Sequence, residues 1–484
     1  MSEKVRTRFA PSPTGYMHIG NLRSALYGYL FAVKNGGDFI LRIEDTDQNR
    51  YVDGAVQIIY DTLADAGITY SEGPDKGGDY GPYMQSERKE IYMEYAKKLI
   101  EKGAAYYCFC TPERLASMKD TSVSDSNGVT RYDKHCLSLT QEEIEANLKA
   151  GIPFVIRQNI PAEGKGTYED MVFGEVSVDY KDMEDGILIK SDGMPTYNFA
   201  NVVDDHLMRI NYVIRGVEYL SSTPKYNLMY DAFGWERPHY MHLSPVMKDA
   251  QHKLSKRNGD ASYQDLVAKG YVKEAILNYI ALLGWAPKDN SEKMTLAEMA
   301  EKFSVDGLSK SPSIYDEAKL RWLSGEYMKD MSEDEFLRRA EPFFAKTEAY
   351  GKYDLNLLCK LLKTRIETFG DIPEKISFLE SFGPFAPSLY DNKKQKCNAD
   401  AARTILPKLR LAMEGWDDYS NAALYEKLVA FAAENGVKNG QVLWCLRIAI
   451  TGTAVTPGGA SEMAELLGKE RTLARLDQAI AWLA

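Results

Sequence analysis

Along residues 1–45 the pattern of apolar and polar positions predicts a strand, a helix and a second strand. The first strand covers residues 5–9, and the Pro-Ser-Pro-Thr-Gly segment at 11–15 ends it. Apolar side chains then recur at helical spacing at Leu22, Ala25, Leu26, Tyr29 and Leu30. Residues 39–43 are nearly all apolar, as is typical of a buried parallel strand. Together these elements predict a βαβ unit with a right-handed crossover.

The pattern changes after about residue 320. Before that point, sheet-like segments return at 153–156, 187–190 and 212–214. After it, strand signals almost vanish, and amphipathic helices are predicted at 333–340, 355–368, 399–413, 422–433 and 462–483. The predicted fold class is therefore α/β at the front of the chain, with a Rossmann-like parallel sheet, followed by an all-α region.

Length and composition favour a multidomain protein of the cytoplasm. A chain of 484 residues exceeds what one compact core supports. Its first residues lack the apolar segment of a secretory signal, and no run of about 18 apolar residues indicates a membrane span. Six cysteines are few for this length and are expected to stay reduced. The net charge of −11 argues against sequence-blind nucleic-acid binding but not against a structured RNA held by local basic patches.

The bend between the first strand and its helix has the composition of an anion site. Pro11, Pro13, Gly15, His18 and Gly20 are crowded into it. A glycine-bearing turn at a helix N-terminus exposes backbone N–H groups and the positive end of the helix dipole, and both favour a phosphate. His18 could donate a further hydrogen bond to a phosphate oxygen. The alternative is a plain connection with a surface histidine, and His18 taken alone favours that alternative.

A second candidate for phosphate binding is the basic segment at 251–260. Lys253, Ser255, Lys256 and Arg257 are followed there by an Asn-Gly turn signal. A basic loop of this kind suits a polyphosphate whose charge is redistributed during reaction. Alone, the segment would indicate no more than a solvated run of charge.

Together the two segments resemble the signatures of the class I aminoacyl-tRNA synthetases. His18-Ile19-Gly20-Asn21 corresponds to the HIGH motif, and Lys253-Leu254-Ser255-Lys256-Arg257 corresponds to KMSKS. Asn21 replaces the last histidine of HIGH, which affects one expected phosphate contact. Further stretches resemble the bacterial glutamyl-tRNA synthetases, namely RFAPSPTGYMHIGNLRSAL, LRIEDTD, PTYNFANVVDDHLM and VIRGVEYLSSTPK. The resemblance is dense over the first 325 residues and loose beyond them.

The resemblance implies a two-step reaction that uses ATP and Mg²⁺. The α-carboxylate of L-glutamate attacks the α-phosphorus of ATP, pyrophosphate leaves, and the glutamyl group passes to a ribose hydroxyl at the 3′ end of tRNA(Glu). Such chemistry needs positioning and charge stabilisation and no enzyme nucleophile. By resemblance, the catalytic residues are His18, Lys253 and Lys256, with Lys256 on the triphosphate. The implied ATP site comprises Pro11, Ser12, Pro13, Thr14, Gly15, His18, Gly20, Asn21, Lys253, Leu254, Ser255, Lys256 and Arg257.

The resemblance also implies a pocket that distinguishes glutamate from glutamine. Its expected members are Arg8, Ala10, Ser12, Glu44, Tyr197, Asn201 and Arg215. Arg215 would bind the side-chain carboxylate, because a planar guanidinium meets a carboxylate with two hydrogen bonds and meets an amide NH₂ with a second donor. Glu44 would hold the α-ammonium group. The alternatives are a surface ion pair for Arg215 and, for Glu44, a helix cap or a pair with Arg42.

By resemblance the chain divides into five parts. Residues 1–104 and 191–260 form the two halves of the catalytic domain, and 105–190 form an inserted domain for the tRNA acceptor end. Residues 261–325 form a stem-contact helical domain, and 326–484 an all-helical anticodon-binding region. Basic residues of that last region could contact tRNA, but each is more simply a solvated helix charge; they include Lys363, Arg365, Arg403, Lys408, Arg410 and Arg447. A monomer is expected.

The cysteines of the predicted insert hint at zinc. Cys108 and Cys110 form a Cys-x-Cys pair, and Cys136 follows with Tyr132 nearby. Some relatives hold structural zinc here with a later Cys-x-His, but Ser138 occupies the position of that histidine. Tyr132 or His135 could supply a fourth ligand. Buried reduced thiols or the remnant of a lost site are the competing interpretations, and they are slightly favoured.

Several other functions fit parts of the sequence. Arg215 and the helical C-terminal region argue against a glutaminyl-tRNA synthetase. The length of that region argues against the short glutamyl-queuosine-forming relatives. A nucleotidylyltransferase fused to a helical module, or a catalytically silent tRNA-binding protein, is opposed by the occurrence of His18, Lys253 and Lys256 together. No motif distinguishes a chain that charges only tRNA(Glu) from one that also charges tRNA(Gln).

Overall fold

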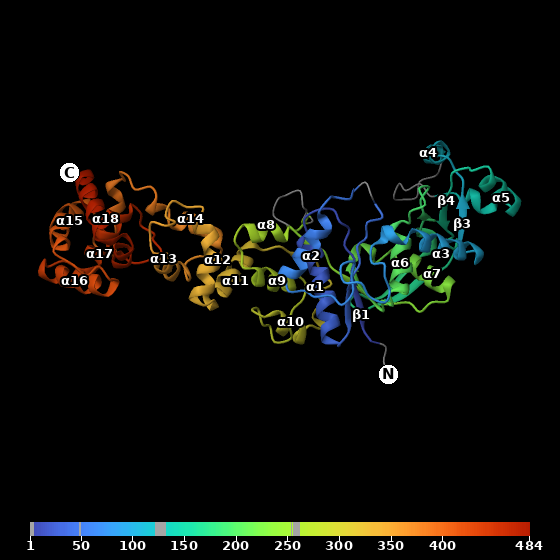
Figure 1. Cartoon of the computed structure of the whole chain (residues 1–484), viewed down its shortest axis with the longest axis horizontal. Coiled ribbons are helices and arrows are strands. Elements are labelled where there is room, and N and C mark those ends of the chain that lie inside the picture. The colour runs from blue at the N-terminus through green and yellow to red at the C-terminus, as the bar shows by residue number, and fades with distance from the viewer. Residues whose placement is uncertain (1–3, 48–49, 122–131, 253, 255–261) are drawn as a thin grey trace. The chain divides into compact units, whose positions relative to one another are not determined.

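The computed structural model describes residues 4–47, 50–121, 132–252, 254 and 262–484. The chain forms two compact units, the first comprising 1–266 with 276–316 and the second 267–275 with 317–484. Each unit is described by itself below (Figure 1). Among the described residues, no helix has both the length and the apolar character that a membrane crossing requires.

The first unit begins with the predicted βαβ arrangement. Strand β1 (Arg6–Phe9) pairs in parallel with β2 (Asp38–Leu41), and helix α1 (Ile19–Lys34) connects them. Four of the five periodic apolar positions of α1 are fully buried, and Tyr29 is half-buried; the four are Leu22, Ala25, Leu26 and Leu30. The prediction for this part of the chain is confirmed.

A four-stranded sheet continues the first unit in the order β6-β5-β9-β8. These strands are β5 (Lys165–Asp170), β6 (Gly174–Asp179), β8 (Tyr212–Gly216) and β9 (His239–Leu243). Strands β8 and β9 run parallel, β5 joins β9 in parallel where Asp170 faces Tyr240, and β6 returns antiparallel to β5. Strands β5, β8 and β9 therefore run in the same direction, and the carboxyl ends of β8 and β9 share one edge, the edge at which open α/β sheets bind ligands.

A separate antiparallel sheet has the order β3-β4-β7. It consists of β3 (Ala105–Cys108), β4 (Val155–Gln158) and β7 (Ile187–Ile189), which confirms the predicted strands near 153–156 and 187–190. Helices α3 (Lys89–Glu101), α6 (Tyr197–Leu207) and α7 (Thr223–Phe233) share a buried core with it. The other elements up to residue 316 are α2 (Ala55–Asp65), α4 (Pro112–Thr121), α5 (Gln141–Lys149), α8 (Tyr263–Ala268), α9 (Lys273–Leu282), α10 (Leu296–Lys302), β10 (Val246–Met247) and β11 (Ser313–Ile314).

From residue 317 onward, the described chain contains helices and one isolated bridge between Asn392 and Cys397. The all-α prediction for the rear is thus confirmed. Its helices are α11 (Glu317–Asp330), α12 (Glu333–Phe344), α13 (Leu355–Leu362), α14 (Ile372–Lys375), α15 (Ala399–Glu414), α16 (Asn421–Glu434), α17 (Asn439–Thr451) and α18 (Ala460–Leu483).

Two predicted helices of the rear differ from the structure. Helix α13 ends at Leu362 and not at 368, and the chain tightens there because the Arg365 N–H donates to the Leu362 carbonyl only three residues back, at 2.7 Å. The segment predicted as one helix over 462–483 is interrupted at Gly468, whose φ of 72° and ψ of 169° are not helical. Because only glycine adopts that conformation readily, the glycine at position 468 explains why the helix is interrupted there.

Candidate active site

A cleft of about 950 Å³ opens at the carboxyl ends of β1 and β8 in the first unit. Predicted site residues that line it are Arg8, Ala10, Pro11, Ser12, Thr14, Gly20, Asn21, Glu44, Tyr197 and Arg215. Pro13, Gly15, His18, Asn201 and Leu254 are described but do not line it. Asn201 lies one turn behind Tyr197, and its amide donates to the Tyr197 carbonyl at 2.6 Å.

The predicted phosphate bend forms the N-terminal end of α1. His18 caps the helix, and its Nδ1 accepts a hydrogen bond from the Gly20 N–H at 3.0 Å. A neutral imidazole that accepts at Nδ1 carries its proton on Nε2, so this cap selects the tautomer that can donate from Nε2. Gly15 has a φ of 102°, which explains why glycine is needed in the turn.

Lys253, Ser255, Lys256 and Arg257 lie outside the described residues. Between Lys253 and Ser255, the backbone N–H of Leu254 donates to the Val246 carbonyl at 3.2 Å, and Val246 lines the cleft. After them, Tyr263 donates to the Met17 carbonyl at 3.0 Å, one residue before the helix cap. These contacts tie Leu254 to a residue that lines the cleft, and they tie Tyr263 to the residue before the cap of α1.

Arg215 is a buried cation that faces the cleft from the end of β8. Its side chain is only 6% exposed, and its guanidinium lies over the rings of Tyr219, Tyr226 and Tyr240 at 4.9–5.4 Å. It donates to His242 and Thr223, and no carboxylate of the described residues lies within ion-pair distance. A surface ion pair is thus excluded for Arg215. Because a buried charge without a counter-ion is costly, the arrangement favours a ligand carboxylate.

Glu44 brings a carboxylate to the same cleft. It pairs with Arg42 at 3.1 Å, which was the alternative considered for it, and it also lines the cleft. Burial raises the pKa of Glu44 to about 7, although the neighbouring Arg42 and Arg8 oppose this shift. An ammonium group of a ligand beside Glu44 would favour the ionised form. The cleft thus offers a cation and an anion to one zwitterionic ligand.

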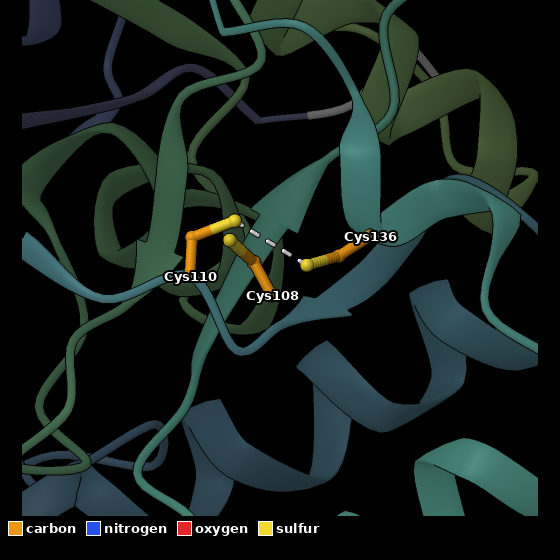
Figure 2. A group of neighbouring side chains, drawn as sticks. All are labelled: Cys108, Cys110 and Cys136. Atoms are coloured by element: carbon orange, nitrogen blue, oxygen red, sulfur yellow. Dashed lines mark hydrogen bonds between the residues drawn. The ribbon is translucent and has the colours of Figure 1, made fainter. Parts of the chain in front are cut away.

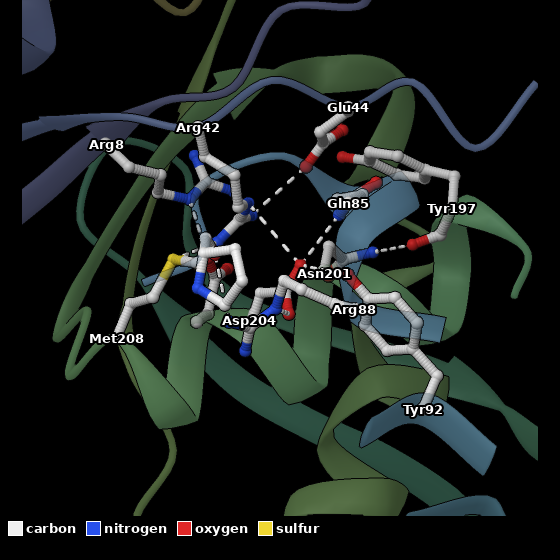
Figure 3. A network of polar contacts seen from close by, with 12 residues as sticks. Arg8, Arg42, Glu44, Gln85, Arg88, Tyr92, Tyr197, Asn201, Asp204 and Met208 are labelled. Atoms are coloured by element: carbon white, nitrogen blue, oxygen red, sulfur yellow. Dashed lines mark hydrogen bonds and ion pairs between the residues drawn. The ribbon is translucent and has the colours of Figure 1, made fainter. Parts of the chain in front are cut away.

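A buried network of charges includes two residues that line the cleft, Arg8 and Glu44. Figure 3 shows its side chains pointing toward one another from separate elements. Its members are the three arginines Arg8, Arg42 and Arg88 and the three acids Glu44, Asp204 and Asp205. Asp205 accepts from Arg42 at 2.7 Å and from Arg8 at 3.0 Å. Because Arg8 and Glu44 both line the cleft, the network fixes their orientation as well as the fold.

The three cysteines of the predicted insert converge (Figure 2). The sulfurs of Cys108, Cys110 and Cys136 lie within 4.8 Å of one another. The Tyr132 hydroxyl lies 3.3 Å from Cys108 Sγ and 3.2 Å from Cys110 Sγ, whereas His135 is exposed and not part of the group. Although burial opposes it, the hydrogen bond with Tyr132 helps to hold the pKa of the Cys108 thiol below its usual value. The side chains therefore offer three sulfurs and one oxygen around a common centre.

Comparison with known proteins decides the family. The catalytic domain described as "tRNA synthetases class I (E and Q)" matches residues 4–322, and an anticodon-binding domain matches residues 335–480. The chain belongs to the glutamate–tRNA ligase family. It is 54% identical to the glutamate–tRNA ligase of Clostridium botulinum (strain Eklund 17B / Type B) over 100% of this chain and 99% of that protein. The relative from Clostridium tetani is 54% identical over 98% of this chain and 96% of its own length.

A solved structure of the family has the same fold. The glutamate tRNA ligase of Elizabethkingia meningosepticum, solved in complex with its amino acid, matches with a TM-score of 0.88 at 34% identity, over 100% of both chains. The fold class inferred from the motifs, a class I catalytic domain followed by a helical anticodon-binding region, is therefore confirmed. The helical rear also agrees with the matched anticodon-binding domain.

The sequence analysis did not identify several side chains around this cleft. Asp205 binds Arg8 and His242 binds Arg215, and both arginines line the cleft. Arg88 and Asp204 were also missed and belong to the same charge network. A signal was present, because two acids directly follow Val202 and Val203 in α6, and His242 interrupts the apolar strand β9. Charged or polar residues at positions that a pattern assigns to the core are expected to have partners there.

Proposed function

We propose that the cleft activates L-glutamate with ATP and that the chain then transfers the glutamyl group to the 3′-terminal ribose of tRNA(Glu). The observation that carries this proposal is Arg215, a buried guanidinium in the cleft without a carboxylate partner among the described residues. A ligand with its own carboxylate supplies the missing counter-ion. Glu44 adds a negative charge to the same cleft, and the α-ammonium group of glutamate would bind beside it.

In the first step an oxygen of the glutamate α-carboxylate bonds to the α-phosphorus of ATP, and the bond to the bridging oxygen of pyrophosphate breaks. The N-terminal end of α1, with Gly20 and Asn21 in the cleft, would hold phosphate oxygens. We assign Lys256, assisted by Lys253, to the charge that builds on the leaving pyrophosphate. Mg²⁺ would accompany the ATP and would neutralise phosphate charge when bound, and Glu218, whose exposed carboxylate lines the cleft, could help to hold it.

The roles of the other parts follow the family. Residues 1–104 and 191–260 would build the catalytic domain, 105–190 would hold the tRNA acceptor end, and 261–325 would contact its stem. Residues 326–484 would recognise the anticodon, where single-stranded bases are bound by stacking and edge hydrogen bonds. We propose a monomer that acts in the cytoplasm.

The purified chain with ATP and Mg²⁺ is expected to charge tRNA(Glu) with radiolabelled glutamate and to reject glutamine. Acid-precipitable counts on separately purified tRNA(Glu) and tRNA(Gln) measure this. Charging of tRNA(Gln) with glutamate would identify the non-discriminating form of the enzyme. ATP–pyrophosphate exchange that ignored both glutamate and tRNA would point to a nucleotidylyltransferase and contradict the proposal.

We further propose that the Cys108, Cys110, Cys136 and Tyr132 cluster holds structural zinc. A tetrahedral zinc with sulfur ligands at about 2.3 Å separates its ligand atoms by about 3.8 Å. The cluster fits this spacing, because Cys110 Sγ lies 3.5 Å from Cys136 Sγ and 3.2 Å from the Tyr132 oxygen. Such an ion would tie β3 to the segment around Cys136 and stabilise the fold of the insert.

The purified chain is expected to contain about one zinc ion per molecule by elemental mass spectrometry. Changing Tyr132 to phenylalanine should leave three thiolates and weaken zinc retention against a chelator, whereas changing Cys108 to serine should abolish it. Cys359→Ala is the matched control, because it removes a buried thiol from the second unit. A folded chain without zinc, or equal retention in all variants, would contradict the assignment.

A further inference from the structure

Two adjacent strands place His242 directly beside Arg215. In the parallel pair β8 and β9, Arg215 and His242 are register partners. Arg215 Nε lies 3.2 Å from His242 Nε2, and Arg215 Nη2 donates to the Thr223 hydroxyl at 2.6 Å. His242 and Thr223 are fully buried. Two of the five N–H groups of the guanidinium are thereby engaged, and the described residues leave Nη1 and the second Nη2 hydrogen to other partners.

The contact with Arg215 fixes the tautomer of His242. A guanidinium N–H can only donate, so His242 Nε2 must accept and carry no proton. The neutral ring then has its proton on Nδ1, which donates to Asp170 Oδ2 at 2.6 Å. Burial lowers the pKa of His242, which agrees with a neutral ring, while Asp170 opposes the shift. The ring therefore links a carboxylate to a guanidinium by one donated and one accepted hydrogen bond.

Asp170 itself is held at the end of β5. Its Oδ1 accepts from the backbone N–H groups of Val172 and Phe173, both at 2.9 Å. The side chain is 1% exposed, and β5 joins β9 at this residue. Asp170, His242 and Arg215 consequently form a row across β5, β9 and β8, and only the last of them lines the cleft.

We propose that Asp170 and His242 are positioning residues that aim the free edge of Arg215 at the side-chain carboxylate of glutamate, and so contribute to selection against glutamine. The inference rests on the proposed function, because it requires that Arg215 binds that carboxylate. Asp170 sets the tautomer of His242, His242 holds Nε of Arg215 with Thr223 on Nη2, and the remaining N–H groups form the fork that a carboxylate fits.

The Asp170→Asn variant tests whether Asp170 acts on Arg215 through His242. It replaces one carboxylate oxygen with an NH₂ group and leaves the size of the side chain unchanged. In the wild type Oδ1 accepts from two backbone N–H groups, and Oδ2 accepts from His242 Nδ1 and from the His242 backbone N–H at 3.2 Å. An asparagine that keeps its amide oxygen at the Oδ1 position turns its NH₂ toward both groups of His242. The histidine must then carry its proton on Nε2, where it meets the N–H of Arg215 donor to donor. The KM for glutamate is expected to rise about 10- to 100-fold, while the KM for ATP changes little. Steady-state charging of tRNA(Glu) at varied glutamate and varied ATP measures both values.

His242→Gln and His242→Met form a second, matched pair of similar size. The glutamine can present an amide oxygen near the position of Nε2, whereas the methionine cannot accept from Arg215 comparably. We expect the KM for glutamate to follow the order wild type, His242→Gln, His242→Met. The ratio of kcat/KM for glutamate to that for glutamine should fall in the same order. If Asp170→Asn fails to fold by circular dichroism, this pair decides the question.

Asp185→Asn is the control for a buried isosteric change. Asp185 is 4% exposed and accepts from Tyr106 and Lys134, away from Arg215. The Asp185→Asn variant should keep the wild-type ratio of the KM for glutamate to the KM for ATP. The positioning role is overturned if the wild type charges glutamate but Asp170→Asn changes neither KM value or shifts both together. The proposed function would survive that result. A wild type that charges no glutamate overturns the proposed function and this inference with it.

Discussion

Replacing Arg215 with methionine is expected to reduce kcat/KM for glutamate by about 30- to 4,000-fold while leaving the KM for ATP nearly unchanged. Removing one partner of a buried, hydrogen-bonded charge pair costs about 2–5 kcal/mol, and each 1.4 kcal/mol is about tenfold. Methionine fills much of the space of the 6% exposed arginine but offers no donor to a carboxylate. Charging kinetics at varied glutamate and varied ATP, with tRNA(Glu) present, give the two effects separately.

Three further measurements sharpen this result. Arg215→Lys should recover only part of the loss, since an ammonium group cannot present the planar fork. Arg237→Met should be silent, because Arg237 pairs with Asp231 on the surface. Glutamate should raise the unfolding temperature of the wild type and not that of Arg215→Met, because a ligand stabilises a protein only as far as it binds. Equal losses toward glutamate and ATP would show that Arg215 is part of the scaffold and not of the glutamate pocket.

The local apolar pattern and the motif residues were enough to predict the βαβ unit and the bend that border the cleft. The periodicity of α1 and the apolar run of β2 define the βαβ unit, and the proline- and glycine-rich bend between them marks the rim of the cleft. Arg8, Glu44, Tyr197 and Arg215 were found through motif resemblance, and the structure brings them to one cleft. Their sequence separation is large, so no local pattern could have shown that they meet.

Other features depend on tertiary context that a sequence does not display. Helix α17 was not predicted, because the run VLWCLRIAI is apolar on nearly every face and lacks an amphipathic period. In the structure α17 packs against α15, α16 and α18, which explains that composition. The partners of Asp204 and His242 likewise come from distant elements, so an acid in a helix or a histidine in a strand indicates a buried contact without naming it.

The charge network below the cleft gives the largest expected effect on stability. Asp204→Ala should reduce the free energy of unfolding of the first unit by about 3–5 kcal/mol, because it leaves buried cations without compensation. Asp204 is fully buried and accepts from Arg88 at 2.7 Å, Tyr92 at 2.8 Å and Gln85 at 2.9 Å (Figure 3). Calorimetry of the full chain should show the unfolding temperature of this unit lowered by roughly 6–20 °C.

The exposed pair of Arg237 and Asp231 provides the matched comparison. Its charges are 41% and 45% exposed, so Asp231→Ala should change stability by less than about 1 kcal/mol. Asp204→Asn should fall between the two, because the amide keeps one acceptor for the donors around it but loses the charge that Arg88 requires. An Asp204→Ala variant that unfolds at the wild-type temperature would mean that the arginines find other partners or water. The network would then orient Arg8 and Glu44 without stabilising the fold, and the loss would appear only in the KM for glutamate.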